Sequence, residues 1–91
     1  MRDIGDRIEV SGTMTVPAAA ALLAEGTALL SRPETVFDLA GVTEVDSSGL
    51  AVVFGWQRAA KRAGKTIRIA NPPQNLGSLA DVYGVRDLLP V

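Results

Sequence analysis

The stretch TVFDLAGVTEVDSSGLAVVFGWQRAAKRAGKTIRIA, residues 35–70, decides the fold. Its first six residues, 35–40, and its last six, 65–70, are rich in β-branched side chains or alternate polar with apolar, as β-strands do. Between them, residues 47–63 carry apolar side chains at helical spacing, and Asp46 in front of them is a preferred N-cap residue. We therefore expect two parallel neighbouring strands that are joined by a helix through a right-handed crossover.

The rest of the chain adds further strands and helices to this unit. We expect a strand at 7–10, a turn at Ser11–Gly12 and a short returning strand at 13–15. We expect helices at 18–30 and at 71–83. A loop at 41–45 should connect the strand at 35–40 to its helix, and the tail at 85–91 should pair with a strand or pack on the fold. Strands that alternate with helices predict an α/β fold with a small mixed β-sheet of about four or five strands and helices packed on it. The length of 91 residues suits a single domain covering residues 1–91.

The composition excludes several classes of function. The chain has no cysteine and no histidine, which rules out disulfides, thiol catalysis, Ser-His-Asp triads, and metal sites built from thiolates or imidazoles. A net charge of −1 gives no general reason to expect nucleic acid or a membrane surface as a partner. The N-terminal residues lack the apolar core of a signal peptide, so we expect an intracellular protein. We expect no catalytic residues, cofactor or metal.

A helical wheel divides the helix at 47–63 into two sides. Val52, Val53, Trp56 and three alanines fall on the side that we expect to pack on the sheet. The opposite side carries Ser47, Leu50, Phe54 and Arg58. Single apolar residues are common on protein surfaces, but an apolar patch with a polar rim indicates a protein contact, and we favour that interpretation. The basic residues nearby are interpreted as a solvated helix end suited to the helix dipole: Arg58, Lys61, Arg62, Lys65 and Arg68.

The sequence Asp46-Ser47-Ser48-Gly49 allows more than one interpretation. The simplest is a helix cap, because aspartate is a preferred N-cap and serine is tolerated in the first turn. A nucleophilic serine is disfavoured, since no histidine can activate it. Two functional alternatives stay open. In the first, Ser47 is phosphorylated, and the phosphate would place about two negative charges beside Leu50 and Phe54 and block a partner. In the second, the unmodified Ser47 hydroxyl contacts a partner directly.

Residues 37–73, FDLAGVTEVDSSGLAVVFGWQRAAKRAGKTIRIANPP, resemble the STAS domain, a family named for sulfate transporters and anti-sigma factor antagonists. The resemblance extends from about residue 8 to residue 89 and implies a small sheet covered by helices, the STAS fold. In anti-sigma factor antagonists, the serine after the aspartate is phosphorylated by a partner kinase, and that position is Ser47 here. Phosphorylation ends binding to the kinase, which is itself the anti-sigma factor.

A second branch of the family is more similar. The stand-alone STAS subunits of Mla-type phospholipid-transport ABC complexes share the motifs VDSSGLA at 45–51, AKRAGK at 60–65, LADVYGV at 79–85 and LLP at 88–90. This resemblance implies a non-catalytic cytoplasmic subunit that binds the ATPase of a bacterial transporter maintaining outer-membrane lipid asymmetry. Contact with the inner membrane would be indirect, through the complex. The partner-binding residues would be Ser47, Leu50, Phe54 and Arg58. The alternative partner is an anti-sigma factor with serine kinase activity.

Overall fold

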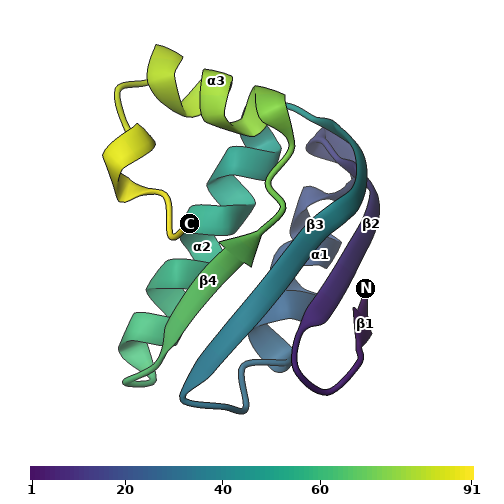
Figure 1. Ribbon diagram of the computed structural model, residues 1–91, viewed down its shortest axis with the longest axis vertical. Helices are drawn as coiled ribbons and strands as arrows, with labels where there is room; N and C mark the ends of the chain where they lie inside the picture. The colour runs from purple at the N-terminus through teal and green to yellow at the C-terminus, as the bar shows by residue number, and fades with distance from the viewer.

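The structure, a computed structural model, describes all residues from Met1 to Val91 as a four-stranded sheet packed against helices (Figure 1). The strands are β1 (Arg2–Asp3), β2 (Ile8–Met14), β3 (Glu34–Val45) and β4 (Thr66–Ala70). The helices are α1 (Val16–Ala28), α2 (Ser47–Arg62) and α3 (Gln74–Val82), followed by a 3-10 turn, η1 (Arg86–Leu88). The predicted α/β class with a small mixed sheet is therefore confirmed.

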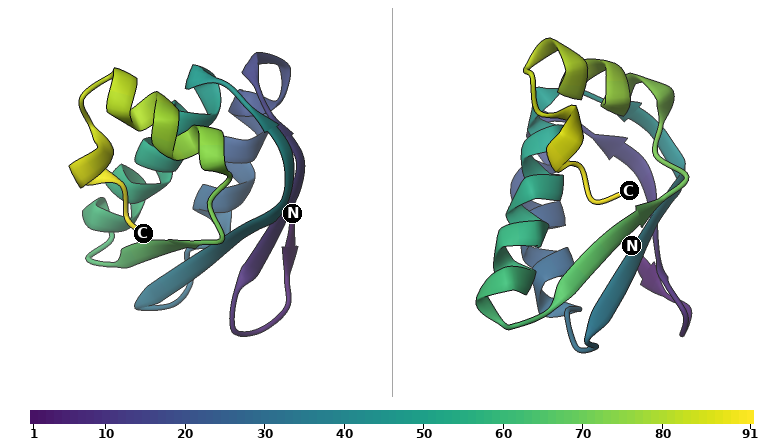
Figure 2. Two further views of the ribbon diagram at one scale, coloured as in Figure 1. Left: turned by 45° about the horizontal axis from the view of Figure 1, so that its top comes forward. Right: turned by 60° about the vertical axis from the view of Figure 1, so that its left-hand side comes forward.

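The sheet has the strand order β1-β2-β3-β4, in which only β1 is antiparallel to its neighbour. The predicted parallel pairing of the strands that flank α2 is confirmed by a register running from Glu34↔Thr66 to Asp38↔Ala70. Helices α1 and α2 pack against one face of the sheet, and α3 lies across the end where β3 leads into α2 (Figure 2). Because α3 closes this end, α2 is enclosed on more sides than a helix that rests on a sheet alone.

The prediction of a turn at Ser11–Gly12 is wrong. Both residues lie inside β2, and the chain reverses earlier, where the Ile4 N–H donates to the Arg7 carbonyl at 3.0 Å. Gly12 has a φ of +83°, and the register between β2 and β3 shifts directly after it. A glycine adopts this conformation without a steric cost. Strand β2 therefore continues through a register shift at Gly12, where the sequence had indicated a turn.

The prediction of a loop at 41–45 is also wrong, because β3 continues to Val45. The second half of β2 supplies a parallel partner for this segment, with Ser11 opposite Gly41 and Met14 opposite Val45. Two register shifts insert extra residues into β3 and bend it. A strand that depends on a distant partner for its hydrogen bonds is not visible in local sequence preference, which is why the segment was predicted as a connection.

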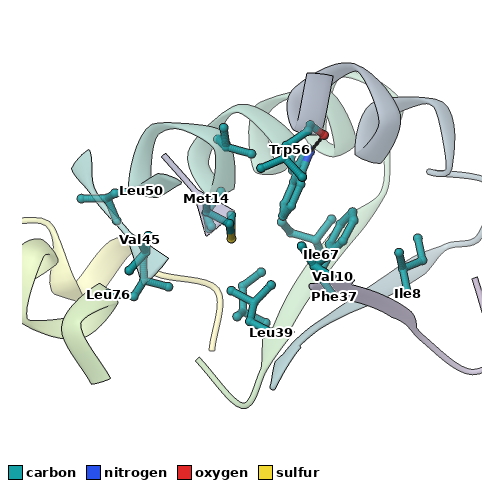
Figure 3. Packing of buried hydrophobic residues seen from close by; sticks show 14 of the residues in the cluster. Ile8, Val10, Met14, Phe37, Leu39, Val45, Leu50, Trp56, Ile67 and Leu76 are labelled. Carbon is teal, nitrogen blue, oxygen red and sulfur yellow. Dashed lines mark hydrogen bonds between the residues drawn. The ribbon is translucent and has the colours of Figure 1, made fainter. Parts of the chain in front are cut away.

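The centre of the core is a stack of two aromatic rings, Phe37 from β3 and Trp56 from α2. Their centroids are 4.1 Å apart and their planes differ by 9°, and both side chains are fully buried (Figure 3). The indole Nε1–H of Trp56 donates a 3.0 Å hydrogen bond to the Leu22 carbonyl of α1. A buried indole needs such a partner. Trp56 thus joins the sheet, α2 and α1 at one point.

The tail after α3 packs back on the sheet, as predicted. The Ile69 N–H of the edge strand β4 donates to the Pro90 carbonyl at 2.7 Å, and the Val85 N–H donates to Ala80 at 2.8 Å. The last residues therefore cover part of the open edge of β4 with a single backbone hydrogen bond.

Candidate functional site

The Asp46 carboxylate connects the first turns of two helices. Its Oδ1 accepts hydrogen bonds from the N–H groups of Ser48 at 2.8 Å and Gly49 at 3.4 Å, which caps α2 as predicted. Its Oδ2 accepts a 3.3 Å hydrogen bond from the Val16 N–H at the start of α1. Thr15, the N-cap residue of α1, makes no side-chain capping bond. One carboxylate therefore caps both helices, a second role that the sequence pattern did not indicate.

We expect Asp46→Ala to lower the free energy of unfolding by about 2 kcal/mol, the upper part of the range for an N-cap residue, because two helices lose their acceptor. Asp46→Asn should be intermediate, since its amide offers one acceptor oxygen in place of two. Urea denaturation followed by circular dichroism measures both. Thr15→Ala is the matched control and should change little. If Asp46→Asn equals the wild type, the bond to Val16 contributes nothing.

Ser47 follows the capping residue and is exposed. Because Asp46 makes the capping bonds, the Ser47 hydroxyl is not needed for the helix and faces solvent. Its neighbour Ser48 is half-buried, and Gly49 is buried against the end of β2. Of the two serines in the motif, Ser47 is the more accessible to a partner or a modifying enzyme.

The structure corrects the position of Leu50. This side chain is 5% exposed and belongs to the hydrophobic core, near Val45 and Leu76 (Figure 3). The helical wheel assigned one buried side to α2, but α1, the sheet and α3 enclose more than half of its circumference. Leu50 lies near Leu76 of α3 within the core, so it is not part of an exposed patch (Figure 3).

The other three predicted residues share the outer side of α2. Ser47 and Arg58 are exposed, and Phe54 lies between them half-buried, partly packed on the core. Ala51 is also exposed and lies between Ser47 and Phe54 on this outer side of α2. The structure thus brings Ser47, Phe54 and Arg58 together on one accessible strip of the helix.

Val16 is a candidate site residue that the sequence analysis missed. Its side chain is 68% exposed, and its N–H is bonded to Asp46, which places it next to Ser47. No local sequence signal could have found it, because the bond partner Asp46 lies 30 residues later in the chain. We call the surface formed by Val16, Ser47, Ala51, Phe54 and Arg58 the Ser47 face.

A depression on the surface lies elsewhere, over β1, β2 and β3. It has a volume of about 470 Å³ and is lined by residues such as Arg2, Glu9 and Asp38, with none from α2. Asp38 is 7% exposed there and is held by the Asn71 side chain at 3.0 Å and the Ala40 N–H at 2.9 Å. These two hydrogen bonds outweigh the burial that opposes them, and with the Arg7 guanidinium 3.5 Å away they hold the pKa of Asp38 below its ordinary value.

The low pKa of Asp38 predicts a loss of stability in acid. The ionised carboxylate contributes stability that is fully present above its unfolded pKa of about 3.9 and is lost as the pH falls through the lower folded value. Asp38→Asn should therefore be less stable than the wild type at pH 7, with a smaller decline below about pH 4. Urea unfolding between pH 2 and pH 7 measures this difference. Asp87→Asn makes the same substitution at an exposed position and is the matched control.

The chain contains no group of three or more acidic side chains placed to hold a metal ion. None of its helices combines the length and the apolar character required to span a bilayer. The Ser47 face combines the Asp46-Ser47-Ser48-Gly49 motif with the accessible apolar side chains of Val16 and Phe54.

Comparison of the sequence with known proteins identifies the family to which this chain is similar. The family model described as "Mlab, STAS domain" matches residues 1–90. A curated relative from Haemophilus influenzae, the intermembrane phospholipid transport system binding protein MlaB, is 33% identical over 58 residues. That match covers 64% of this chain and 55% of the relative, so the chain spans about half the length of that protein.

Two solved structures share the fold. The anti-sigma factor antagonist SpoIIAA in its unphosphorylated form superposes with a TM-score of 0.72 at 14% identity, covering 97% of this chain and 82% of that one. A sulfate transporter family protein from Wolinella succinogenes also gives a TM-score of 0.72, at 15% identity, covering 98% and 75%. These likenesses show the predicted STAS fold.

Proposed function

This chain belongs to the MlaB-type STAS domain family, and from that membership we propose that it is a non-catalytic subunit of a bacterial phospholipid-transport ABC transporter of the Mla type. In this role it binds and regulates the cytoplasmic ATPase subunit. It reaches the inner membrane only through the complex, which maintains the lipid asymmetry of the outer membrane. The observation that carries the proposal is the family match over residues 1–90, supported by the relative whose name refers to phospholipid transport.

The Ser47 face is the proposed docking surface for the ATPase. Phe54 would be the anchor, because a half-buried aromatic ring presents a large apolar area at little cost in conformational entropy. Val16 and Ala51 would extend the apolar contact, while Ser47 would add a hydrogen bond and Arg58 a charge at the rim. Leu50 would act indirectly, by holding α2 against α3 from within the core.

Truncation of the anchor tests this surface. We expect Phe54→Ala to weaken binding to the purified ATPase subunit by about 2 kcal/mol, roughly a thirtyfold rise in Kd. Isothermal titration calorimetry measures the Kd, and the ATPase rate of the assembled complex should fall in parallel. Leu88→Ala, which truncates another exposed apolar side chain outside the Ser47 face, is the matched control.

The Phe54 side chain also touches the core, so circular dichroism must show that the Phe54→Ala variant is folded at the assay temperature. A folded variant with wild-type affinity would remove the Ser47 face as the docking surface. Strong loss of binding in Leu88→Ala, with none in Phe54→Ala, would move the docking surface to the C-terminal side of the fold.

A second function rests on one observation, the exposed and structurally unused hydroxyl of Ser47. In this alternative the chain is an anti-sigma factor antagonist that a partner serine kinase inactivates by phosphorylating Ser47. The phosphate would add about two negative charges next to the Asp46 carboxylate and to Phe54, which opposes an apolar contact. Intact-mass measurement after incubation with candidate kinases tests it. A gain of one phosphate that Ser47→Ala abolishes and Ser48→Ala keeps would favour the antagonist over the transporter subunit.

A further inference from the structure

The basic residues of the protein are not distributed evenly. Four of the nine arginines and lysines form ion pairs with carboxylates, and Lys65 donates a 2.7 Å hydrogen bond to the Leu30 carbonyl. Arg68 is exposed on β4, in register with Val36 of β3. The remaining three are exposed on α2 without an acidic partner, and we call them the basic strip: Arg58, Lys61 and Arg62.

The arrangement of the basic strip is unfavourable within the isolated chain. Arg58 is three residues from Lys61 and four from Arg62, so these like charges lie next to each other on the helix surface and repel. No acidic residue lies on α2 to offset the repulsion. The helix dipole accounts for Lys61 and Arg62 in the last turn, but its effect fades beyond that turn and does not extend to Arg58. The net charge of −1 shows that the strip does not follow from a generally basic composition.

The basic strip is continuous with the Ser47 face. Arg58 belongs to both, and it lies one helical turn after Phe54 on the same accessible side of α2. A partner that covers Phe54 therefore reaches Arg58, and a partner that extends by one further turn reaches Lys61 and Arg62. The exposed side of α2 is thus apolar and small in its first half and positively charged in its second half.

We propose that the basic strip binds an acidic segment of the same protein partner that docks on the Ser47 face. This inference rests on the proposed function and specifies the chemistry of the ATPase surface, namely carboxylates placed one to two helical turns beyond the pocket for Phe54. An anionic membrane is the less suitable occupant, because recognition of acidic lipids typically uses about four to eight clustered cations. The strip has three, and the second half of α2 has no exposed large apolar side chain to insert between lipids.

Charge reversal combined with a salt series tests the proposal. The variant Lys61→Glu/Arg62→Glu leaves the Ser47 face intact and should raise the Kd for the purified ATPase subunit roughly tenfold at low ionic strength. Most of this change should appear in the association rate, because charges at the rim of an interface steer the encounter. In 0.5 M salt the variant and the wild type should converge, because exposed charges are then screened. Surface plasmon resonance measures both rates.

The controls separate this inference from the proposed function. Arg68→Glu makes the same kind of charge change on the sheet and should leave both rates unchanged. If Phe54→Ala weakens binding while Lys61→Glu/Arg62→Glu has no effect at any salt concentration, the basic strip is only a solvated helix end. In that case this inference is wrong, while the proposed function stands. If the wild type does not bind the ATPase, the proposed function and this inference fail together. If the strip instead governs binding to vesicles containing phosphatidylglycerol and not to the ATPase, the occupant is a membrane and the proposal is overturned.

Discussion

Gly26→Ala should lower the free energy of unfolding by about 3 kcal/mol, although alanine is a better helix former than glycine by about 1 kcal/mol. A Cβ atom at this position would lie 2.2 Å from Nε1 of Trp56 and 2.5 Å from Cε2. Trp56 is fully buried, stacked on Phe37 and bonded to Leu22, so the ring cannot move without breaking these contacts. The indole N–H would lose its partner, and an unpaired buried donor adds about 1–3 kcal/mol.

Gly55→Ala is the matched control, because it adds the same methyl group at the same crossing of α1 and α2. Its Cβ would meet Cδ1 of Leu23 at 2.6 Å, the free end of a flexible and partly exposed side chain. Leu23 can rotate away, so we expect a change within about 1 kcal/mol. Urea denaturation followed by circular dichroism compares the two variants. Equal losses would mean that the crossing is limited by backbone distance and not by the position of Trp56.

Gly49→Ala should destabilise the protein to a similar degree, by about 3 kcal/mol, for a different reason. Its Cβ would lie 2.5 Å from the Met14 carbonyl oxygen and 2.4 Å from Cγ2 of Val45. The Met14 carbonyl is backbone and already accepts the Asp46 N–H at 3.3 Å. Relief of the clash would require the start of α2 to move away from β2, which would also strain the shared cap. Thermal unfolding should show a melting temperature lower by roughly 10–20 °C.

The control for Gly49 is Gly41→Ala in β3. Its Cβ would have contacts of 3.2 Å to the Ser11 Cβ and the Val10 carbonyl, which a shift of a few tenths of an ångström relieves. We expect a loss below about 1 kcal/mol there. If Gly49→Ala is instead as stable as the wild type, the glycine of the motif is free of steric constraint, and its presence would need a functional explanation.

The features that local sequence signals predicted correctly are those that depend on residues close together in the chain. The α2 helix, its Asp46 cap and the two strands beside it follow from hydrophobic spacing and capping chemistry. The family resemblance also identified the STAS fold correctly, as the family match over residues 1–90 shows.

The features that were missed depend on contacts between distant segments. Leu50 was misplaced because the wheel does not record that α3, some 25 residues later in the chain, covers it. The bond from Asp46 to Val16 joins residues 30 positions apart, so no local pattern could reveal Val16 as a neighbour of Ser47. The same holds for residues 41–45, whose strand conformation depends on the extension of β2.

The shared cap at Asp46 has a consequence for the way the Ser47 face responds to a ligand. The first turns of α1 and α2 both donate backbone hydrogen bonds to the Asp46 carboxylate, so fraying of one helix weakens the cap of the other. Local unfolding in this region should therefore be cooperative, with the amides of Val16 and Ser48 exchanging with solvent as one unit. A phosphate on Ser47 or a bound partner that moves Asp46 would therefore destabilise the first turn of α1 as well as that of α2. The same two helices are joined a second time by the hydrogen bond from Trp56 of α2 to the Leu22 carbonyl of α1. Phosphorylation of Ser47 or binding of a partner there would therefore alter the packing of α1 on α2 at both contacts.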